Sequence, residues 1–251
     1  MKKIVGFMLA ALMVVGLMGG VAMAQDEELM QDFVNLEKVY IPPLFFTNQG
    51  PDYIAPAQMT MNKLIKEWNA FYTKYYDYKP DYANWQSYFD AIDTAIKDAA
   101  TKIDGTPAAH EVLEAVRATM LDLRPKNGFP KFITDKMTIY HDPMEHIVLT
   151  LKNATAPTPE LMAELALTLE ETQKAWSDVE KCPVDAGLWG FSVQQMNMYY
   201  NMLQAERDAL DAFAAAFAAG NFPLMKQTGT LALKGPFVQA YKFFGAFPTM
   251  Q

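Results

Sequence analysis

The sequence predicts an all-α protein made of two tandem up-and-down four-helix bundles related by an internal repeat. Apolar side chains recur at three- and four-residue steps from residue 25 onward, and strand-like alternation is nearly absent. Proline, glycine and helix-cap residues divide this periodic sequence into eight segments of helical length, four for each bundle. Two stretches one hundred residues apart, beginning at Tyr40 and Tyr140, also correspond in part.

Residues 1–24 have the features of a secretory signal peptide. Lys2 and Lys3 precede an apolar run to about Gly20, and Ala22-Met23-Ala24 forms a small-x-small cleavage site, so cleavage is expected after Ala24. The short basic start is typical of bacteria and predicts a periplasmic location. No later apolar run is long enough to cross a bilayer, so no membrane insertion is expected after cleavage.

The first bundle is expected over residues 25–128. Its predicted helices are one over about 27–41, one with an apolar stripe from 61 to 75, one over about 85–105 and one from 107 to about 125. Pro42-Pro43 should break or kink the first helix, because proline lacks the N–H that continues a helix. Thr106-Pro107 predicts the N-cap and first turn of the fourth helix.

The second bundle is expected over residues 129–251. Its predicted helices begin near residue 131 and at residue 159, and continue over about 192–219 and about 223–244. Thr158-Pro159 has the composition of an N-cap and first turn, and Gly220-Asn221 that of a helix end. The two halves match only with gaps, so a single larger bundle of eight helices is the alternative.

The segment from Tyr140 to Val148 carries the main functional motif, because it holds two of the three histidines. In place of Ile41, Phe45 and Phe46 in the first half, the second half has His141, Glu145 and His146. These three pairs are called the exchanged positions. An unpaired carboxylate buried at such a position would cost several kcal/mol. The motif is therefore expected to be exposed, paired internally as Glu–His, or completed by a cation.

A metal site is the more specific of two interpretations of this motif. Imidazole and carboxylate groups suit zinc, iron or copper, and Met144 and Met137 as soft ligands would favour Cu(I). Non-covalent haem is a further candidate cofactor. The predicted metal ligands are His141, Glu145, His146, Met144 and Met137.

The alternative interpretation is structural. Asp142 is a good N-cap, Pro143 suits a first helical position, and Glu145 would close a capping box. If the helix instead continues through Pro143, then Met137, His141, Met144 and Glu145 share one face.

Three other groups of residues are assigned weaker roles. His110, with Glu114 and Arg117 on its side of a helix, is interpreted as part of a solvated polar face, and it could reach the motif only if the bundles pack that way. Methionines at 196, 198 and 202 are interpreted as core rather than as soft-metal ligands. Among the tyrosines around Pro80, the predicted partner or ligand surface consists of Tyr76, Tyr78 and Tyr82.

Composition argues against several classes of function. Without the signal peptide the chain has 19 basic and 29 acidic residues, a net charge of −10 that disfavours nucleic acid as a partner. Neither a nucleophile turn nor a phosphate-binding loop is present, so an enzyme is not expected. Cys182 is the single cysteine and cannot form an intrachain disulfide. The sequence therefore predicts a periplasmic binding protein that uses a metal ion or haem. The alternative is an interaction or scaffold protein of the bacterial envelope without a cofactor.

Overall fold

The computed structural model describes residues 26–79 and 84–249, and every regular element in these two ranges is helical. The predicted all-α class is therefore confirmed for the described residues. The predicted signal peptide, Pro80 and Tyr82 lie outside these ranges. None of the described helices combines the length and apolar character needed to cross a membrane.

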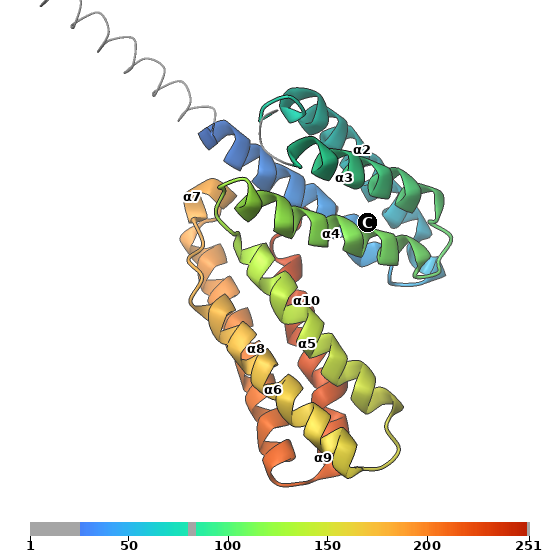
Figure 1. Cartoon of the computed structure of the whole chain (residues 1–251), viewed down its shortest axis with the longest axis vertical. Coiled ribbons are helices and arrows are strands. Elements are labelled where there is room, and N and C mark those ends of the chain that lie inside the picture. Colours follow the sequence, from blue (N-terminus) through green and yellow to red (C-terminus); the bar gives the residue numbers. More distant parts are fainter. Residues whose placement is uncertain (1–25, 80–83, 250–251) are drawn as a thin grey trace, which may run out of the picture.

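The helices form two groups, and the first lies across one end of the second (Figure 1). The first group contains an N-terminal helix (residues 26–46), the 3-10 turn η1 (Pro51–Tyr53), α2 (Ile54–Tyr75), α3 (Trp85–Thr101) and α4 (Ala108–Lys126). The second contains α5 (Ile133–Asn153), α6 (Pro159–Glu180), the short α7 (Ala186–Trp189), α8 (Val193–Ala218), α9 (Phe222–Gln227), a π-helical segment (Thr228–Ala232) and α10 (Leu233–Lys242).

Two of the predicted helix starts are confirmed by their cap hydrogen bonds. The Leu161 N–H donates to Thr158 Oγ1 (3.2 Å) at the start of α6. At α8, the Gln195 N–H donates to Ser192 Oγ (3.2 Å) and the Ser192 N–H donates to Gln195 Oε1 (2.9 Å), a reciprocal capping box. The predicted N-cap at Thr106 is wrong by one residue, because its N–H and hydroxyl both donate to the carboxylate of Asp104 (2.8 and 2.6 Å).

The predicted break at Pro42-Pro43 is wrong, since the N-terminal helix continues to residue 46. Pro42 has no N–H to donate to the carbonyl of Lys38, four residues earlier. That carbonyl instead accepts the N–H of Ala246, from the C-terminal segment, at 2.7 Å. A tertiary hydrogen bond thus replaces the one that proline removes.

The capping interpretation of Asp142-Pro143 is also wrong, because α5 runs through both residues. The N-cap of α5 is Phe132, whose N–H donates to Asp135 Oδ2 at 2.7 Å. Asp142 sits in the middle of the helix with its side chain exposed. The continued helix places His141 and Glu145 one turn apart, as the alternative interpretation expected.

The predicted last helix is interrupted by the π-helical segment, in which Thr230 has non-helical backbone angles (φ −109°, ψ −107°). Gly229 lies there against Leu151 and Phe213, so closely that a Cβ atom would come within 2.3 Å of Leu151 Cδ1. A residue without a side chain is therefore needed where this segment crosses α5 and α8.

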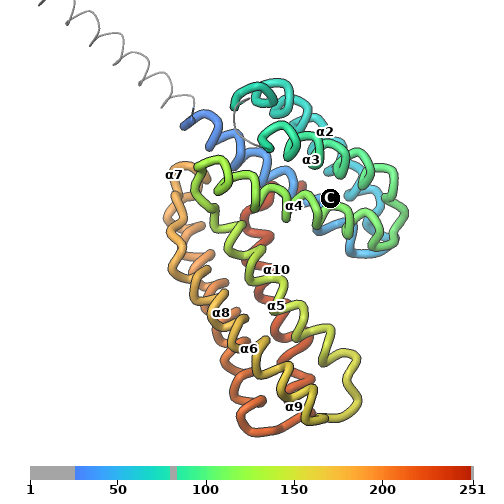
Figure 2. Tube along the Cα trace, viewed as in Figure 1, coloured from blue at the N-terminus to red at the C-terminus, as the bar shows by residue number. Residues whose placement is uncertain are grey.

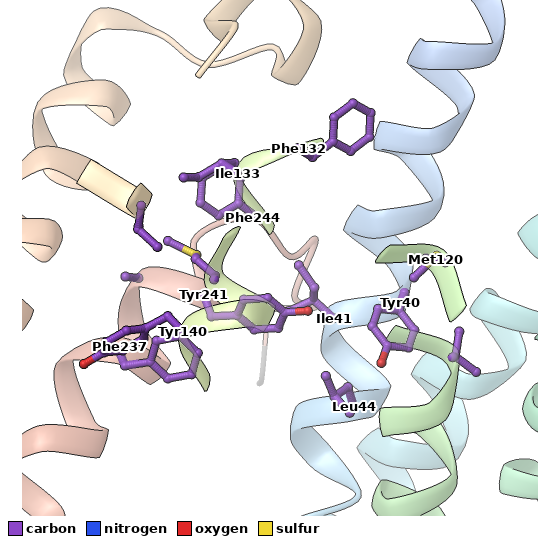
Figure 3. Close-up of a cluster of buried hydrophobic side chains, with 14 of the residues drawn as sticks. Tyr40, Ile41, Leu44, Met120, Phe132, Ile133, Tyr140, Phe237, Tyr241 and Phe244 are labelled. Carbon is purple, nitrogen blue, oxygen red and sulfur yellow. The ribbon is translucent and has the colours of Figure 1, made fainter. Parts of the chain in front are cut away.

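The buried apolar side chains of the two groups form one connected cluster. Figure 2 shows α10 running beside α5 toward the N-terminal helix, and Figure 3 shows the side chains that meet there. In Figure 3, Tyr241 of α10 lies between Phe237 on one side and Ile41 of the N-terminal helix on the other. The junction of the groups is thus a packed part of the core.

Two buried polar clusters lie within this core. Arg124 of α4 donates to Glu37 of the N-terminal helix (2.8 Å) and through Nε to Asp135 of α5 (3.0 Å), so one guanidinium connects three helices. In the second group, the hydroxyl of Tyr140 donates to the fully buried carboxyl group of Glu206. Burial raises the pKa of Glu206 to about 8, although Tyr140, the Phe237 backbone and Arg207 each lower it.

Candidate functional site

The structure does not bring the predicted metal ligands together. His141 faces α4, where its Nδ1 lies 3.0 Å from Arg117 Nη2. His146 faces α6, where its Nε2 lies 2.6 Å from Glu164 Oε1, and its side chain is 52% exposed. Glu145 is held by Lys234 of α10, whose Nζ lies 2.9 and 2.8 Å from the two carboxylate oxygens. Each member of the motif therefore pairs with a different helix, and the Glu145–His146 pair is not formed.

The two methionines of the predicted set are core residues. Met137 and Met144 are both fully buried and belong to the connected apolar cluster. Within residues 26–79 and 84–249, no group of three His, Cys, Asp or Glu side chains has the geometry to hold a metal ion. Thioethers packed in a core contribute to stability by filling space.

The predicted tyrosine surface is only partly described. Tyr76 contacts Phe89 of α3 with ring centroids 6.2 Å apart, and the Tyr78 hydroxyl donates to Asp26 of the N-terminal helix at 2.8 Å. Tyr82 lies outside the described residues. The two described members thus contact neighbouring helices, and their role in binding a partner stays a prediction.

A cleft of about 110 Å³ lies at the junction, where α4, α5 and α10 meet the end of the N-terminal helix. One water needs roughly 10–15 Å³ by this measure, so the cleft has room for a small organic molecule. The cleft is lined by Ile41, Leu44, Phe45, Asn48, Gln49, His110, Glu114, Arg117, His141, Lys234, Phe237, Val238, Tyr241 and Lys242. Ile41 and His141, the first pair of exchanged positions, therefore both line it.

His110 lies in this cleft, so its interpretation as part of a solvated face is wrong. Its side chain is 21% exposed, and its Nδ1 lies 2.8 Å from the carbonyl oxygen of Leu44. A carbonyl can only accept, so Nδ1 carries the proton and Nε2 faces Glu114 Oε1 at 3.3 Å. Burial lowers the pKa of His110, and Arg117 and His141 lower it further, whereas Leu44 and Glu114 raise it.

Arg117 connects His110 and His141 through a short network. Its guanidinium pairs with Glu114 and also donates to His141 Nδ1. The same Nδ1 also lies 3.6 Å from Asp142 Oδ1, so the His141 ring has a cationic and an anionic neighbour. Arg117 and Glu114 together connect the imidazoles of His110 and His141, which come from different helical groups.

Lys242 and Tyr241, neighbours on α10, supply two further polar groups. Lys242 Nζ lies 3.9 Å from the centroid of the Phe45 ring and 5.1 Å from that of Phe247, and burial lowers its pKa. Tyr241 is 6% exposed. Its hydroxyl makes no hydrogen bond of good geometry with the described residues, although Arg117 lies over its ring. Both residues line the cleft, and the Tyr241 hydroxyl is buried beside Arg117.

Sequence reasoning missed most of this site. No sequence motif points to Lys234, Tyr241 or Lys242, and the one related signal is that His110 can reach the motif when the two bundles pack in that way. The packing of the two groups does bring His110 to the motif, since His110 and His141 line the same cleft. The missing information was tertiary, since the lining comes from segments up to 200 residues apart.

Comparisons of the chain with models of known protein families, with curated proteins and with solved structures find no match.

Proposed function

We propose that the protein is a non-enzymatic binding protein of the bacterial periplasm that holds a small ligand in the junction cleft. The observation that carries this proposal is the convergence of charged and aromatic side chains from four helices on one apolar hollow. Concave, mostly apolar sites with a few convergent polar groups are typical of small-molecule binding. The signal peptide predicted for residues 1–24 supports the location.

The placement of the side chains favours an organic ligand over a metal ion or haem. Arg117 occupies the space between His110 and His141, and its positive charge would repel a metal cation there. A volume of about 110 Å³ is also well below the roughly 300–1,000 Å³ of clefts that hold drug-sized ligands, so a porphyrin would not fit.

Thermal denaturation with a panel of small molecules tests this proposal. The panel contains organic anions, organic cations, neutral molecules, Zn²⁺ and Cu²⁺, added to residues 25–251. A ligand at one hundred times its Kd stabilises the folded state by about 2.7 kcal/mol, which corresponds to a Tm increase of roughly 5–10 °C for a chain of this size.

A pair of tryptophan variants locates the site. Val238→Trp fills the cleft, whereas Val193→Trp adds the same ring at a position that is 80% exposed and outside the cleft. The proposal expects at least one panel member to stabilise the wild type and Val193→Trp but not Val238→Trp. A panel without any such member, or one whose binders act equally on both variants, contradicts it.

An interaction or scaffold protein is the second candidate, and one surface feature favours it. Met198 is 48% exposed, so its interpretation as a core residue is wrong, and it lines a second hollow of about 520 Å³ with Met202 of α8 and Pro236 of α10. Methionine-rich apolar surfaces can adapt to protein partners. On this proposal, Met198→Glu abolishes capture of an envelope protein by the tagged chain and Met59→Glu, another exposed methionine, does not; equal capture by both would contradict it.

We also propose that the two helical groups are copies of one four-helix unit. Tyr40 and Tyr140 are both fully buried in the first helix of their group, and Trp68 and Trp176 are buried in the second. An experimental structure in which the first group superposes on the second with these pairs in register would support the repeat. Superposition in any other register would contradict it.

A further inference from the structure

The three cations of the cleft differ in how well their charge is neutralised. Arg117 is paired with Glu114, and Lys234 is paired with Glu145. Within the described part of the chain, Lys242 has no carboxylate within ion-pair distance, and its ammonium group lies between the rings of Phe45 and Phe247. In a chain with a net charge of −8, the cleft thus contains a positive charge that no carboxylate of the described residues neutralises.

Tyr241, which also lines the cleft, provides a neutral donor. Its hydroxyl is buried and makes no hydrogen bond of good geometry with the described residues, and a buried polar group in this state destabilises the protein. An acceptor atom from a ligand would satisfy it. An acceptor atom would complement both Lys242 and Tyr241, and the positive charge of Lys242 favours an anionic acceptor.

The rest of the lining limits the size and charge of that anion. Ile41, Leu44, Phe45, Phe237 and Val238 give the cleft mainly apolar walls. A doubly charged ion such as phosphate would have to lose its hydration against these walls with one uncompensated cation as its partner. A single negative charge attached to an apolar group matches both parts of the cleft.

From this arrangement we infer that the ligand is a small organic monocarboxylate with an apolar body. Its carboxylate is bound by Lys242 and Tyr241, and its body packs against the rings of Phe45 and Phe237. This ligand class presupposes the binding function proposed above, and the experiment below separates the two.

Isothermal titration with three probes of nearly the same shape tests the ligand class. Benzoate, benzamide and benzylammonium differ mainly in charge, and inorganic phosphate serves as an anion without an apolar body. The wild type is expected to bind benzoate, with much weaker binding of the other three. Val238→Trp should lose benzoate binding and Val193→Trp should keep it.

Two conservative variants assign the carboxylate partners. Lys242→Met keeps an apolar stem against Phe45 and should weaken benzoate binding about ten- to a hundredfold, the range for a charge-assisted hydrogen bond. Tyr241→Phe removes only the hydroxyl and should also weaken binding about ten- to a hundredfold, because its hydrogen bond to a carboxylate is charge-assisted too, without lowering the Tm of the ligand-free protein. Lys174→Met, which removes the same charge at an exposed position on α6, should leave binding unchanged.

The outcomes distinguish the ligand class from the binding function. Binding of benzamide or benzylammonium that Val238→Trp abolishes would overturn the carboxylate ligand and leave the binding function standing. Phosphate binding stronger than that of benzoate would also overturn it. Benzoate binding that Lys242→Met and Lys174→Met weaken equally would show general charge attraction and would reject Lys242 as the carboxylate partner. If none of the probes binds, the monocarboxylate inference is rejected, and the wider panel then decides the binding function.

Discussion

Replacing the buried acid Glu206 by glutamine should change how the stability of the protein depends on pH. The pKa of Glu206 is about 8 in the folded protein against 4.5 for an ordinary glutamic acid, and burial is the main cause. Below about pH 4.5 the carboxyl group is protonated in both states, so its raised pKa has no cost. Between about pH 4.5 and pH 8 the unfolded chain releases the proton while the folded chain keeps it. The free energy of unfolding must then fall as the pH rises.

The size of this effect follows from the difference in pKa. A difference of about 3.5 pH units at 1.36 kcal/mol per unit gives a ceiling of about 5 kcal/mol, fully lost at and above about pH 8. Glutamine can still accept the hydrogen bond of Tyr140 and has no proton to release in this range. Any cost of its amide group is the same at every pH. The stability of Glu206→Gln relative to the wild type should therefore rise with pH by several kcal/mol.

Urea denaturation of residues 25–251 at several pH values from about 4.5 to about 8 measures this difference. Glu170→Gln, which makes the same chemical change at an exposed position on α6, is the control and should show a nearly constant difference from the wild type. A difference for Glu206→Gln that stays within about 0.5 kcal/mol across the whole range would refute the assignment of a raised pKa to this group.

Two further predictions concern stability at fixed pH. Gly229→Ala should destabilise the protein by about 1–3 kcal/mol, because its Cβ would overlap Leu151 and Phe213. Gly235→Ala, with no atom within 4 Å of its Cβ, should be neutral or stabilising. Equal denaturation midpoints for both variants would contradict this account of the π-helical segment. Arg124→Met should lower the free energy of unfolding by about 3–5 kcal/mol, because it leaves two buried carboxylates without their cation. The exposed Lys126→Met should lower it by less than about 1 kcal/mol. A similar loss in both variants would show that the buried triad stabilises the fold no more than a surface ion pair does.

Helical periodicity and local capping could be predicted from the sequence because they depend on neighbouring residues. The caps at Thr158 and Ser192 and the buried positions of Trp68 and Trp176 illustrate this. The continuation of the N-terminal helix through Pro42 could not be predicted in this way. Local sequence shows that a hydrogen bond is lost there, but the group that replaces it is far away along the chain.

The candidate site was predictable only in part for the same reason. His141 was recognised from its exchange with Ile41, and it does line the cleft. The expected pairing of Glu145 with His146 was wrong. Glu145 pairs with Lys234 instead, and His146 pairs with Glu164. The direction of each side chain from α5 is set by which helix packs on that side, and this depends on the arrangement of both groups.

The hydrogen bond from Ala246 to Lys38 joins residues that are 208 positions apart. Any folding intermediate in which only the first helical group has formed must keep that carbonyl hydrated in the middle of a helix, beside a proline. The hydrogen bonding of the N-terminal helix is therefore complete only when the C-terminal segment packs against it. A fragment that stops at residue 128 would carry a weak point at Pro42 that the whole chain does not have.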